Sequence, residues 1–176
     1  YSTQPPKLRD MILANTDVMG SLATTVAPVV NMTLGLKPTK AVMDCVLKVD
    51  KHRTFPKYAS QTFERWYKKN VSAFQGSFKR HVSMFHGCYV NYNYPQLGKD
   101  LVSVMNALGY GVHLLDKEKC CGTALISNGM IDQAKKNAKV NVENIRKSVN
   151  ERQMPVISTS SSCTFTIRDE YSHLLG

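Results

Sequence analysis

The second half of the chain alternates short apolar runs with stretches in which apolar residues recur every three or four positions. The short runs predict three strands, which lie in HVSMFHGC (81–88), in GVHLLD (111–116) and in PVISTSSSC (155–163), where the third strand runs into a loop that leads to a helix at Cys163. The periodic stretches predict helices over 97–108, 131–149 and 167–174. Such alternation is typical of a parallel sheet with right-handed crossovers. The predicted fold class is therefore α/β, with a small parallel sheet and flanking helices in three strand–helix units.

Cysteines stand at the end of each predicted strand. Cys88 ends the first strand, Cys120 and Cys121 follow the second, and Cys163 follows the third. Because the carboxyl ends of parallel strands share one edge of the sheet, where open α/β folds bind ligands, we expect these four thiols to converge. A disulfide between adjacent cysteines would strain its ring, whereas four thiolates suit tetrahedral zinc or an iron–sulfur cluster. The alternative is that all four are small apolar side chains of the core.

For the remaining candidate residues, a structural role is favoured over a functional one. Cys45 lies in an apolar helical stripe and is predicted to be a core residue. His86 would share a face with Cys88 on a continuous strand, either as a ligand or as a hydrogen-bonded structural histidine. Asn91 and Asn93 can line the site, but turn and cap chemistry is their ordinary role. Five cysteines, two of them adjacent, do not form a disulfide framework and favour a reducing, cytoplasmic compartment.

The first half of the chain carries most of the net charge of +10. Residues 1–80 hold 13 Lys and Arg against 5 Asp and Glu, whereas residues 81–176 hold 10 against 8. We predict a basic helical extension and linker over 1–80 and the cysteine-bearing α/β domain over 81–176. The chain begins at Tyr1 without a signal-peptide pattern, and we expect it to be a fragment of a longer subunit.

A stretch of 19 uncharged residues, VMGSLATTVAPVVNMTLGL (18–36), is long enough to cross a membrane. Its glycines, its proline and its polar side chains instead favour two short helices that lie on protein or on a membrane surface. Residues 51–80 mix basic and aromatic side chains and predict a linker followed by a short helix. No nucleic-acid-binding motif is apparent, so we expect the basic surplus to face an acidic partner subunit or anionic lipid.

The order GC, CCG and Ser-Ser-Cys resembles the CCG cysteine-rich domain of redox-enzyme subunits. That family includes a subunit of heterodisulfide reductase and the iron–sulfur subunits of lactate and glycolate oxidases. Four segments are similar to the branch of the family that serves anaerobic glycerol-3-phosphate dehydrogenases: LRDMILANTDVMGS, FHGCYVNYNYPQLGKDLVSVMNALG, LLDKEKCCGTALISNG and STSSSCTFTIRDEYSHLL.

The resemblance implies a set of ligands. Cys88, Cys120, Cys121 and Cys163 match the ligand positions of the family's motif, for a 4Fe-4S iron–sulfur cluster or, alternatively, zinc. Ser160 stands where the family pattern C-x-x-C has a cysteine, so one thiolate is lost there. Ser160 as a weak oxygen ligand, and His86, are the additional metal-ligand candidates.

The resemblance also implies a function, that of the electron-transfer subunit of a membrane-associated anaerobic glycerol-3-phosphate dehydrogenase. Such a subunit passes electrons from a flavoprotein catalytic subunit toward the quinone pool, together with a further subunit, on the cytoplasmic, inner face of the cell membrane. No acid–base pair or activated nucleophile is apparent, so the chain itself is expected to be non-catalytic. Two alternatives stay open. One is a zinc-stabilised CCG scaffold for subunit or membrane docking, and the other is a basic module that binds lipid or nucleic acid.

Overall fold

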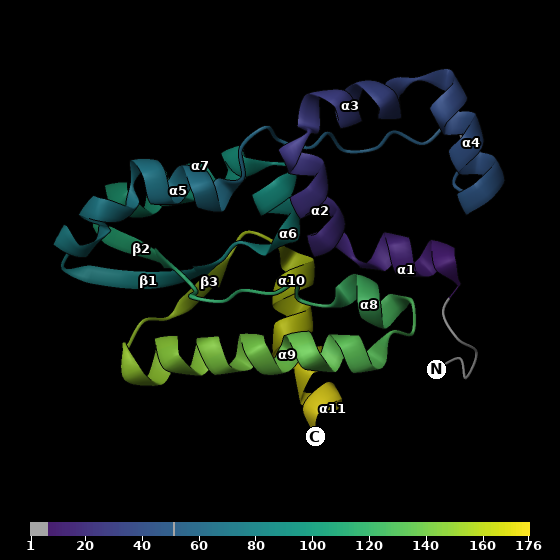
Figure 1. Cartoon of the computed structure of the whole chain (residues 1–176). Helices are drawn as coiled ribbons and strands as arrows, with labels where there is room; N and C mark the ends of the chain where they lie inside the picture. Colours follow the sequence, from purple (N-terminus) through teal and green to yellow (C-terminus); the bar gives the residue numbers. More distant parts are fainter. Residues whose placement is uncertain (1–6, 51) are drawn as a thin grey trace.

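The structure is a computed structural model that describes residues 7–50 and 52–176. Within these residues the centre is a parallel sheet of three strands in the order β2-β1-β3, formed by β1 (Arg80–Phe85), β2 (Tyr110–Leu114) and β3 (Val156–Ser158). Met84 on the central strand lies opposite Leu114 on one side and Ile157 on the other. The predicted α/β class with a small parallel sheet is confirmed (Figure 1).

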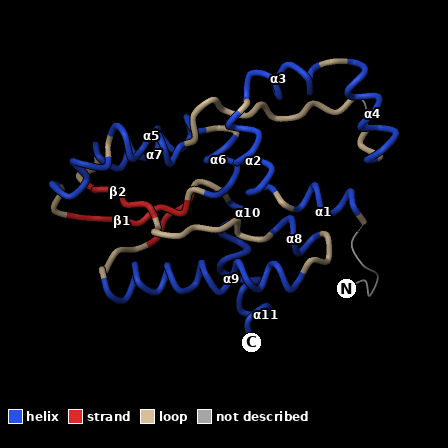
Figure 2. The backbone as a smooth tube through the Cα atoms, in the orientation of Figure 1, coloured by secondary structure: helices blue, strands red, loops and turns tan. Residues whose placement is uncertain are grey.

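Helices follow each strand, as the apolar periodicity predicts. After β1 come α6 (Gly87–Tyr92) and α7 (Pro95–Ala107), and after β2 come α8 (Thr123–Ser127) and α9 (Ile131–Arg146). A π-helical turn, η2 (Lys147–Glu151), prolongs α9 toward β3. After β3 the chain ends in α10 (Ser161–Phe165), the π-helical turn η3 (Thr166–Glu170) and α11 (Tyr171–Leu175). Figure 2 shows how short the strands are beside the helices that flank them.

The first strand ends earlier than predicted. β1 stops at Phe85 rather than at Cys88, because His86 already has helical backbone angles and Gly87 turns the chain with a φ of +72°. Glycine suits Gly87 for two reasons. Its φ lies in the left-handed region, and a Cβ there would lie 3.3 Å from the Cys163 sulfur. Cys88 is therefore placed by the first turn of α6, and His86 does not share a strand face with it.

The third strand runs into a loop, as predicted. β3 ends at Ser158, and Ser160 is the N-cap of α10, where its hydroxyl accepts a hydrogen bond from the Cys163 N–H. Cys163 thus lies in the first turn of a helix that begins at the carboxyl edge of the sheet, as predicted.

Both faces of the sheet are covered, which explains why its strands read as apolar runs. Figure 1 shows α5 (Phe63–Asn70) and α7 over one face and α9 along the other. The core of the first face contains Phe63, Tyr67, Val82, Met84, Val90, Val102 and Val112. On the side of α9 a second cluster contains Ala14, Leu125, Ala134, Ala138, Tyr171 and Leu174.

The N-terminal region is helical, as predicted. It consists of α1 (Leu8–Ala14), α2 (Thr16–Thr25), α3 (Ala27–Gly35) and α4 (Lys37–Leu47). The uncharged stretch forms α2 and α3, the expected pair of short helices. Across the described ranges, no single helix has the length and apolar character to cross a membrane. By length and composition alone, α2 and α3 together do, but they are bent by 106° at their break.

The prediction that Cys45 is a core residue was wrong. Cys45 is exposed on α4, together with Val42 and Val46. The apolar stripe is present, but α4 packs chiefly against α3 and extends away from the sheet (Figure 1), so this face of the helix meets solvent. Helical spacing indicates which residues share a face, but it does not indicate whether anything covers that face.

The predicted linker and short helix within 51–80 are present as an irregular segment, α5, and the 3-10 helix η1 (Ser72–Ser77). Residues 1–6 and Lys51, which belong to the predicted extension and linker, lie outside the described residues. Although α5 precedes the predicted domain boundary at 81, it packs into the core of the sheet. The division into 1–80 and 81–176 therefore stays a prediction.

Candidate metal centre

The four predicted thiols lie at the carboxyl edge of the sheet. Cys88 is in the first turn of α6 after β1, Cys120 and Cys121 are in the loop after β2, and Cys163 is in α10 after β3. Cys88 is half-buried, and the other three are buried. Cys45 is on α4 and takes no part. The parallel topology thus delivers sulfur atoms from three separate loops to one edge, as expected for this sheet.

The thiols lie in two neighbouring pairs. The Cys120 thiol donates to the Cys88 sulfur over 4.0 Å. Cys121 and Cys163 pack against Phe85 in one small core cluster. Cys120 therefore contacts Cys88, whereas the adjacent Cys121 packs with Cys163.

Amide side chains of α9 hold the loop that carries Cys120 and Cys121. Asn141 accepts a hydrogen bond from the Lys119 N–H at 2.9 Å and donates to the Lys119 carbonyl at 3.0 Å. Asn137 donates to the Cys120 carbonyl, and Asn144 donates to the carbonyl of Lys117. These asparagines were not among the sequence candidates. Their spacing on one face of an amphipathic helix, where buried positions are normally apolar, is the signal that could have identified them.

Two polar residues of α2 reach the thiols, and both were missed. Thr16 donates its hydroxyl to the Cys88 sulfur at 3.5 Å and lies 3.4 Å from the Cys120 sulfur. Asp17 accepts a hydrogen bond from the Cys120 N–H at 2.7 Å. No local sequence pattern could have linked Asp17 to Cys120, because the two are 103 positions apart.

His86 and Glu118 form a buried pair beside the thiols. Glu118 accepts hydrogen bonds from the Gly87 N–H at 2.6 Å and the His86 N–H at 3.0 Å, which fixes the turn that leads to Cys88. The His86 Nδ1 lies 3.2 Å from Glu118 Oε1. Burial lowers the pKa of His86, and burial raises the pKa of Glu118 to about 8 against its two N–H donors. Both groups therefore favour their neutral forms, and the contact is not an ion pair.

The additional ligand candidates from the sequence have other partners. The His86 ring packs edge-on against Phe63, and its Nδ1 is already engaged, which favours the structural alternative. Ser160 lies beside Cys163 but uses its hydroxyl to cap α10. Asn91 is buried within α6 and accepts a hydrogen bond from the Glu64 N–H at 3.0 Å, which ties α5 to α6. Asn93 donates to the Lys57 carbonyl.

Hydrogen bonds between the thiols shift their pKa values in different directions. The hydrogen bond with Cys120 and, next, burial raise the pKa of Cys88, and the hydrogen bond with Cys121 raises the pKa of Cys120 to about 11. The hydrogen bond from Cys121 lowers the pKa of Cys163, against the effect of burial. Cys163 is thus the thiol that ionises most readily, and a metal must displace protons from Cys88 and Cys120 in order to bind them.

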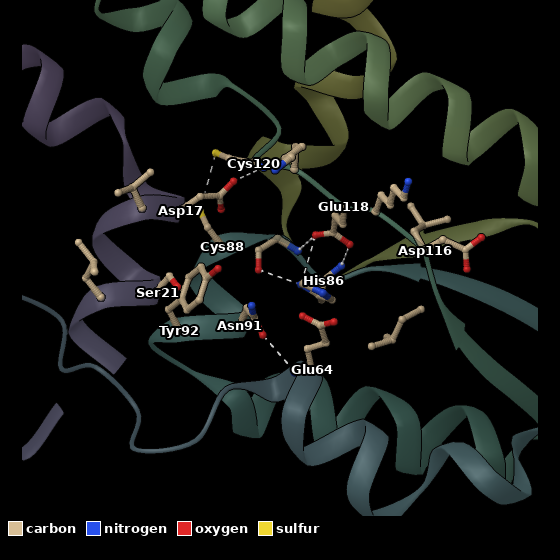
Figure 3. A pocket seen from close by; sticks show the side chains of 17 residues that line it. Asp17, Ser21, Glu64, His86, Cys88, Asn91, Tyr92, Asp116, Glu118 and Cys120 are labelled. Atoms are coloured by element: carbon tan, nitrogen blue, oxygen red, sulfur yellow. Dashed lines mark hydrogen bonds and ion pairs between the residues drawn. The ribbon is translucent and has the colours of Figure 1, made fainter. Parts of the chain in front are cut away.

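A pocket of about 480 Å³ opens onto the Cys88 end of the site (Figure 3). Its walls come from α2, α6 and the loop after β2, and they include Asp17, Glu64, His86, Cys88, Asp116, Glu118 and Cys120. Cations and small molecules can therefore reach the Cys88–Cys120 pair from solvent.

The donor set fits a thiophilic metal or cluster. Soft thiolate ligands select zinc, copper(I) and iron–sulfur clusters. In the part of the chain that the structure describes, one set of three ligand atoms lies within 4.8 Å of one another, from Asp17, Cys88 and Cys120. The sulfurs of Cys121 and Cys163 lie outside this set. A single zinc ion would instead hold four sulfurs at the corners of a tetrahedron about 3.8 Å apart.

Comparison with known proteins finds a match over the part of the chain that contains the four thiols. The family model of the CCG cysteine-rich domain matches residues 82–168. The chain is 54% identical over all 176 residues to the C subunit of anaerobic glycerol-3-phosphate dehydrogenase from Escherichia coli K12, of which it covers 44%. It is 34% identical over 87 residues to lactate utilization protein A of Bacillus subtilis 168, which is 49% of this chain and 34% of that protein. It is 29% identical over 85 residues to the B subunit of the CoM/CoB fumarate reductase from Methanothermobacter marburgensis, which is 48% of this chain and 16% of that protein.

These relatives are longer than the chain, which spans 44% of the Escherichia coli protein. No solved structure matches the chain. The cysteine-rich match together with the iron–sulfur proteins among the relatives supports a metal or iron–sulfur cofactor.

Proposed function

Since this chain carries a cysteine-rich domain of the CCG family over residues 82–168, we propose that it is part of the electron-transfer subunit of an anaerobic glycerol-3-phosphate dehydrogenase. The observation that carries the proposal is the meeting of Cys88, Cys120, Cys121 and Cys163 at one edge of the sheet. The identity of 54% to the Escherichia coli protein supplies the choice of dehydrogenase.

The cofactor proposed for these thiols is a 4Fe-4S cluster, which supplies one-electron redox chemistry when bound. Two of the four sulfurs share a group of ligand atoms within 4.8 Å of one another, and this arrangement supports a cluster of several metal atoms over one ion held by all four. The protein's part is to provide the thiolates, to exclude water around Cys121 and Cys163, and to direct polar groups at sulfur. Thr16 is such a group, because its hydroxyl donates to the Cys88 sulfur.

The partners follow from the same proposal. Electrons come from a flavoprotein catalytic subunit and leave toward the quinone pool, with a further subunit in the complex. The position is cytoplasmic and peripheral on the inner face of the membrane. The basic surplus of residues 1–80 supports attraction to anionic lipid. The apolar side chains that α2, α3 and α4 expose, among them Leu22, Val29, Met32 and Val46, support contact with a lipid surface.

The test of the cofactor is metal analysis of protein purified without oxygen. We expect iron and acid-labile sulfide in equal amounts, broad visible absorption, and an electron paramagnetic resonance signal after reduction with dithionite. Serine at position 88, 120, 121 or 163 should lower the iron content several-fold, whereas the matched variant Cys45→Ser should not. Loss of iron in Cys45→Ser to the same extent would contradict the assignment of the ligands.

A second candidate function is a zinc-stabilised scaffold that docks subunits or membrane without moving electrons. The specific observation in its favour is the set formed by Asp17, Cys88 and Cys120, whose ligand atoms lie close enough to share one ion. A colourless protein with one zinc per chain, and no iron after reconstitution with iron and sulfide, would establish the scaffold and overturn electron transfer.

A further inference from the structure

The thiols at the Cys88 end are covered by a helix that lies outside the cysteine-rich match at 82–168. This helix is α2, and its first turn carries Thr16 and Asp17. It is held against α6 by close packing, because a Cβ at Gly20 would overlap the ring of Tyr92. Figure 3 shows Asp17, Cys88 and Cys120 directed toward one another from α2, α6 and the loop after β2.

The position of Asp17 is fixed by a contact that leaves its ligand capacity intact. One carboxylate oxygen accepts the Cys120 N–H at 2.7 Å. A carboxylate has two oxygens with two lone pairs each, so it can keep this hydrogen bond and also bind a metal. A carboxylate oxygen of Asp17 and the sulfurs of Cys88 and Cys120 all lie within 4.8 Å of one another.

We propose that Asp17 is an oxygen ligand of the metal centre, bound beside Cys88 and Cys120, so that α2 adds a donor from outside the cysteine-rich match. This inference rests on the proposed metal centre, but it holds for an iron of a cluster and for a single zinc ion alike. The family's missing thiolate at Ser160 lies at the Cys163 end. Asp17 therefore adds a donor at the opposite end and does not replace the missing one.

The chemistry of such a site is well defined. Carboxylate and thiolate ligands are combined on one metal ion in proteins. Binding of a divalent ion would form two metal–sulfur bonds and one metal–oxygen bond, release the two thiol protons to solvent, and transfer no electron. The hydrogen bond from Thr16 to Cys88 would help to hold the sulfur in place.

The alternative is that Asp17 only positions Cys120 and does not bind the metal. In that case the carboxylate serves only to accept the Cys120 N–H. The Asp17→Asn variant would keep that function, because an amide oxygen accepts the same hydrogen bond but is a far weaker metal ligand. The Asp17→Cys variant loses the oxygen acceptor and offers a thiolate. The two variants therefore give opposite results for the two roles.

The experiment titrates cobalt(II) into the metal-free 176-residue chain and follows the visible bands that report ligand number and type. For Asp17→Asn we expect the dissociation constant for cobalt(II) to rise at least about 10-fold, the lower bound for loss even of groups that only support a ligand. Asp17→Cys should restore tight binding with stronger thiolate-to-cobalt absorption. The matched control is Asp10→Asn, since Asp10 lies on α1 and contacts Arg9 instead of the thiols.

Iron-loaded protein gives the second measurement. Asp17→Asn should change the electron paramagnetic resonance spectrum or lower the iron content, and Asp10→Asn should change neither. If the wild-type chain holds iron and Asp17→Asn leaves both its spectrum and its cobalt(II) affinity unchanged, Asp17 is not a ligand, although the electron-transfer proposal stands. If the wild-type chain holds no iron but binds cobalt(II) in a manner that depends on Asp17, the proposed function fails and the ligand assignment stands.

Discussion

Gly122 lets two neighbouring cysteines reach opposite ends of the site. Cys120 is directed to Cys88 and Cys121 to Cys163, after which the chain must turn at once into α8. That turn uses a φ of +94° at Gly122, a backbone conformation that side chains with a Cβ disfavour. A Cβ there would also lie 3.5 Å from the Ala134 Cβ on α9, an ordinary contact. The need for glycine is therefore conformational rather than steric.

Replacing Gly122 should destabilise the protein through its backbone alone. We expect Gly122→Ala to lower the free energy of unfolding by about 1–2 kcal/mol, the cost of the left-handed conformation for a residue with a Cβ, and to weaken metal binding. Urea denaturation measures the first and metal analysis the second. Gly35→Ala is the control, because Gly35 has no positive φ and nothing lies within 4 Å of an added Cβ. Equal stability of both variants would show that the turn at Gly122 is not strained by alanine.

At the scale of elements, α9 does more than cover the sheet. Its inner face combines small apolar residues with asparagines, so that the same helix packs against the core and holds the backbone of the cysteine loop. Asn141 is fully buried and has three partners, the Lys119 N–H, the Lys119 carbonyl and the Tyr171 hydroxyl. Tyr171 in turn donates to the Cys121 carbonyl at 2.9 Å. Helix α9 and the C-terminal helices thus form one support for the loop.

Removing the central amide should loosen this support. Asn141→Ala would remove the partner of the Lys119 N–H and of the Lys119 carbonyl, and one of the two hydrogen bonds of the Tyr171 hydroxyl, so we expect a loss of about 1–3 kcal/mol in the free energy of unfolding. Metal content should fall as well, because the loop positions Cys120 and Cys121. Thermal unfolding and metal analysis test both effects against Asn150→Ala, whose exposed side chain lies on η2. A stable Asn141→Ala variant that binds metal normally would contradict the role of α9.

The contact between β1 and β2 includes a pair of histidines and predicts a dependence on pH. His113 Nε2 lies 3.1 Å from His81 Nδ1. Burial, His81 and Arg152 lower the pKa of His113 below its ordinary 6.5. The unfolded chain therefore takes up this proton first, so the contribution of His113 to stability is complete above pH 6.5 and is lost as the pH falls below it. The pH dependence of unfolding below about pH 6.5 should be shallower in His113→Gln. The control is His173→Gln, which replaces an exposed histidine. If this variant showed an equally shallow pH dependence of unfolding, His113 would be excluded as the specific source of that dependence.

The sequence predicted those elements that follow from local periodicity. The three strands, α7 and α9 follow from spacing, and the meeting of four thiols follows from parallel topology. The contact of Asp17 with Cys120 could not be predicted, because the two residues are 103 positions apart and no sequence pattern links them. The sequence predicted a short helix at α5 but not its packing into the core, because few of its residues are apolar. Phe63 and Tyr67 are its buried residues, and the remaining positions of FERWYKKN are polar or partly exposed.

At the scale of the whole molecule, the region before residue 81 contributes to both the core and the thiol site. Helix α5 completes the core over one face of the sheet, and α2 covers the thiols at its edge. Phe63 is fully buried, and a Cβ at Gly98 on α7 would come within 2.6 Å of its ring. The cysteine-rich domain thus packs against segments that precede the family match at 82–168.

This interdependence predicts that a substitution outside the cysteine-rich match destabilises the whole fold. Phe63→Ala removes a fully buried ring from the core cluster that includes residues of β1, β2 and α7, and we expect the free energy of unfolding to fall by about 3–5 kcal/mol. Phe74→Ala is the matched control, because Phe74 on η1 is 45% exposed and should change stability by no more than about 0.5 kcal/mol. Urea denaturation followed by far-ultraviolet circular dichroism measures both. If α5 were only part of a linker, the two variants would be equally stable, and the fold would depend on residues 81–176 alone.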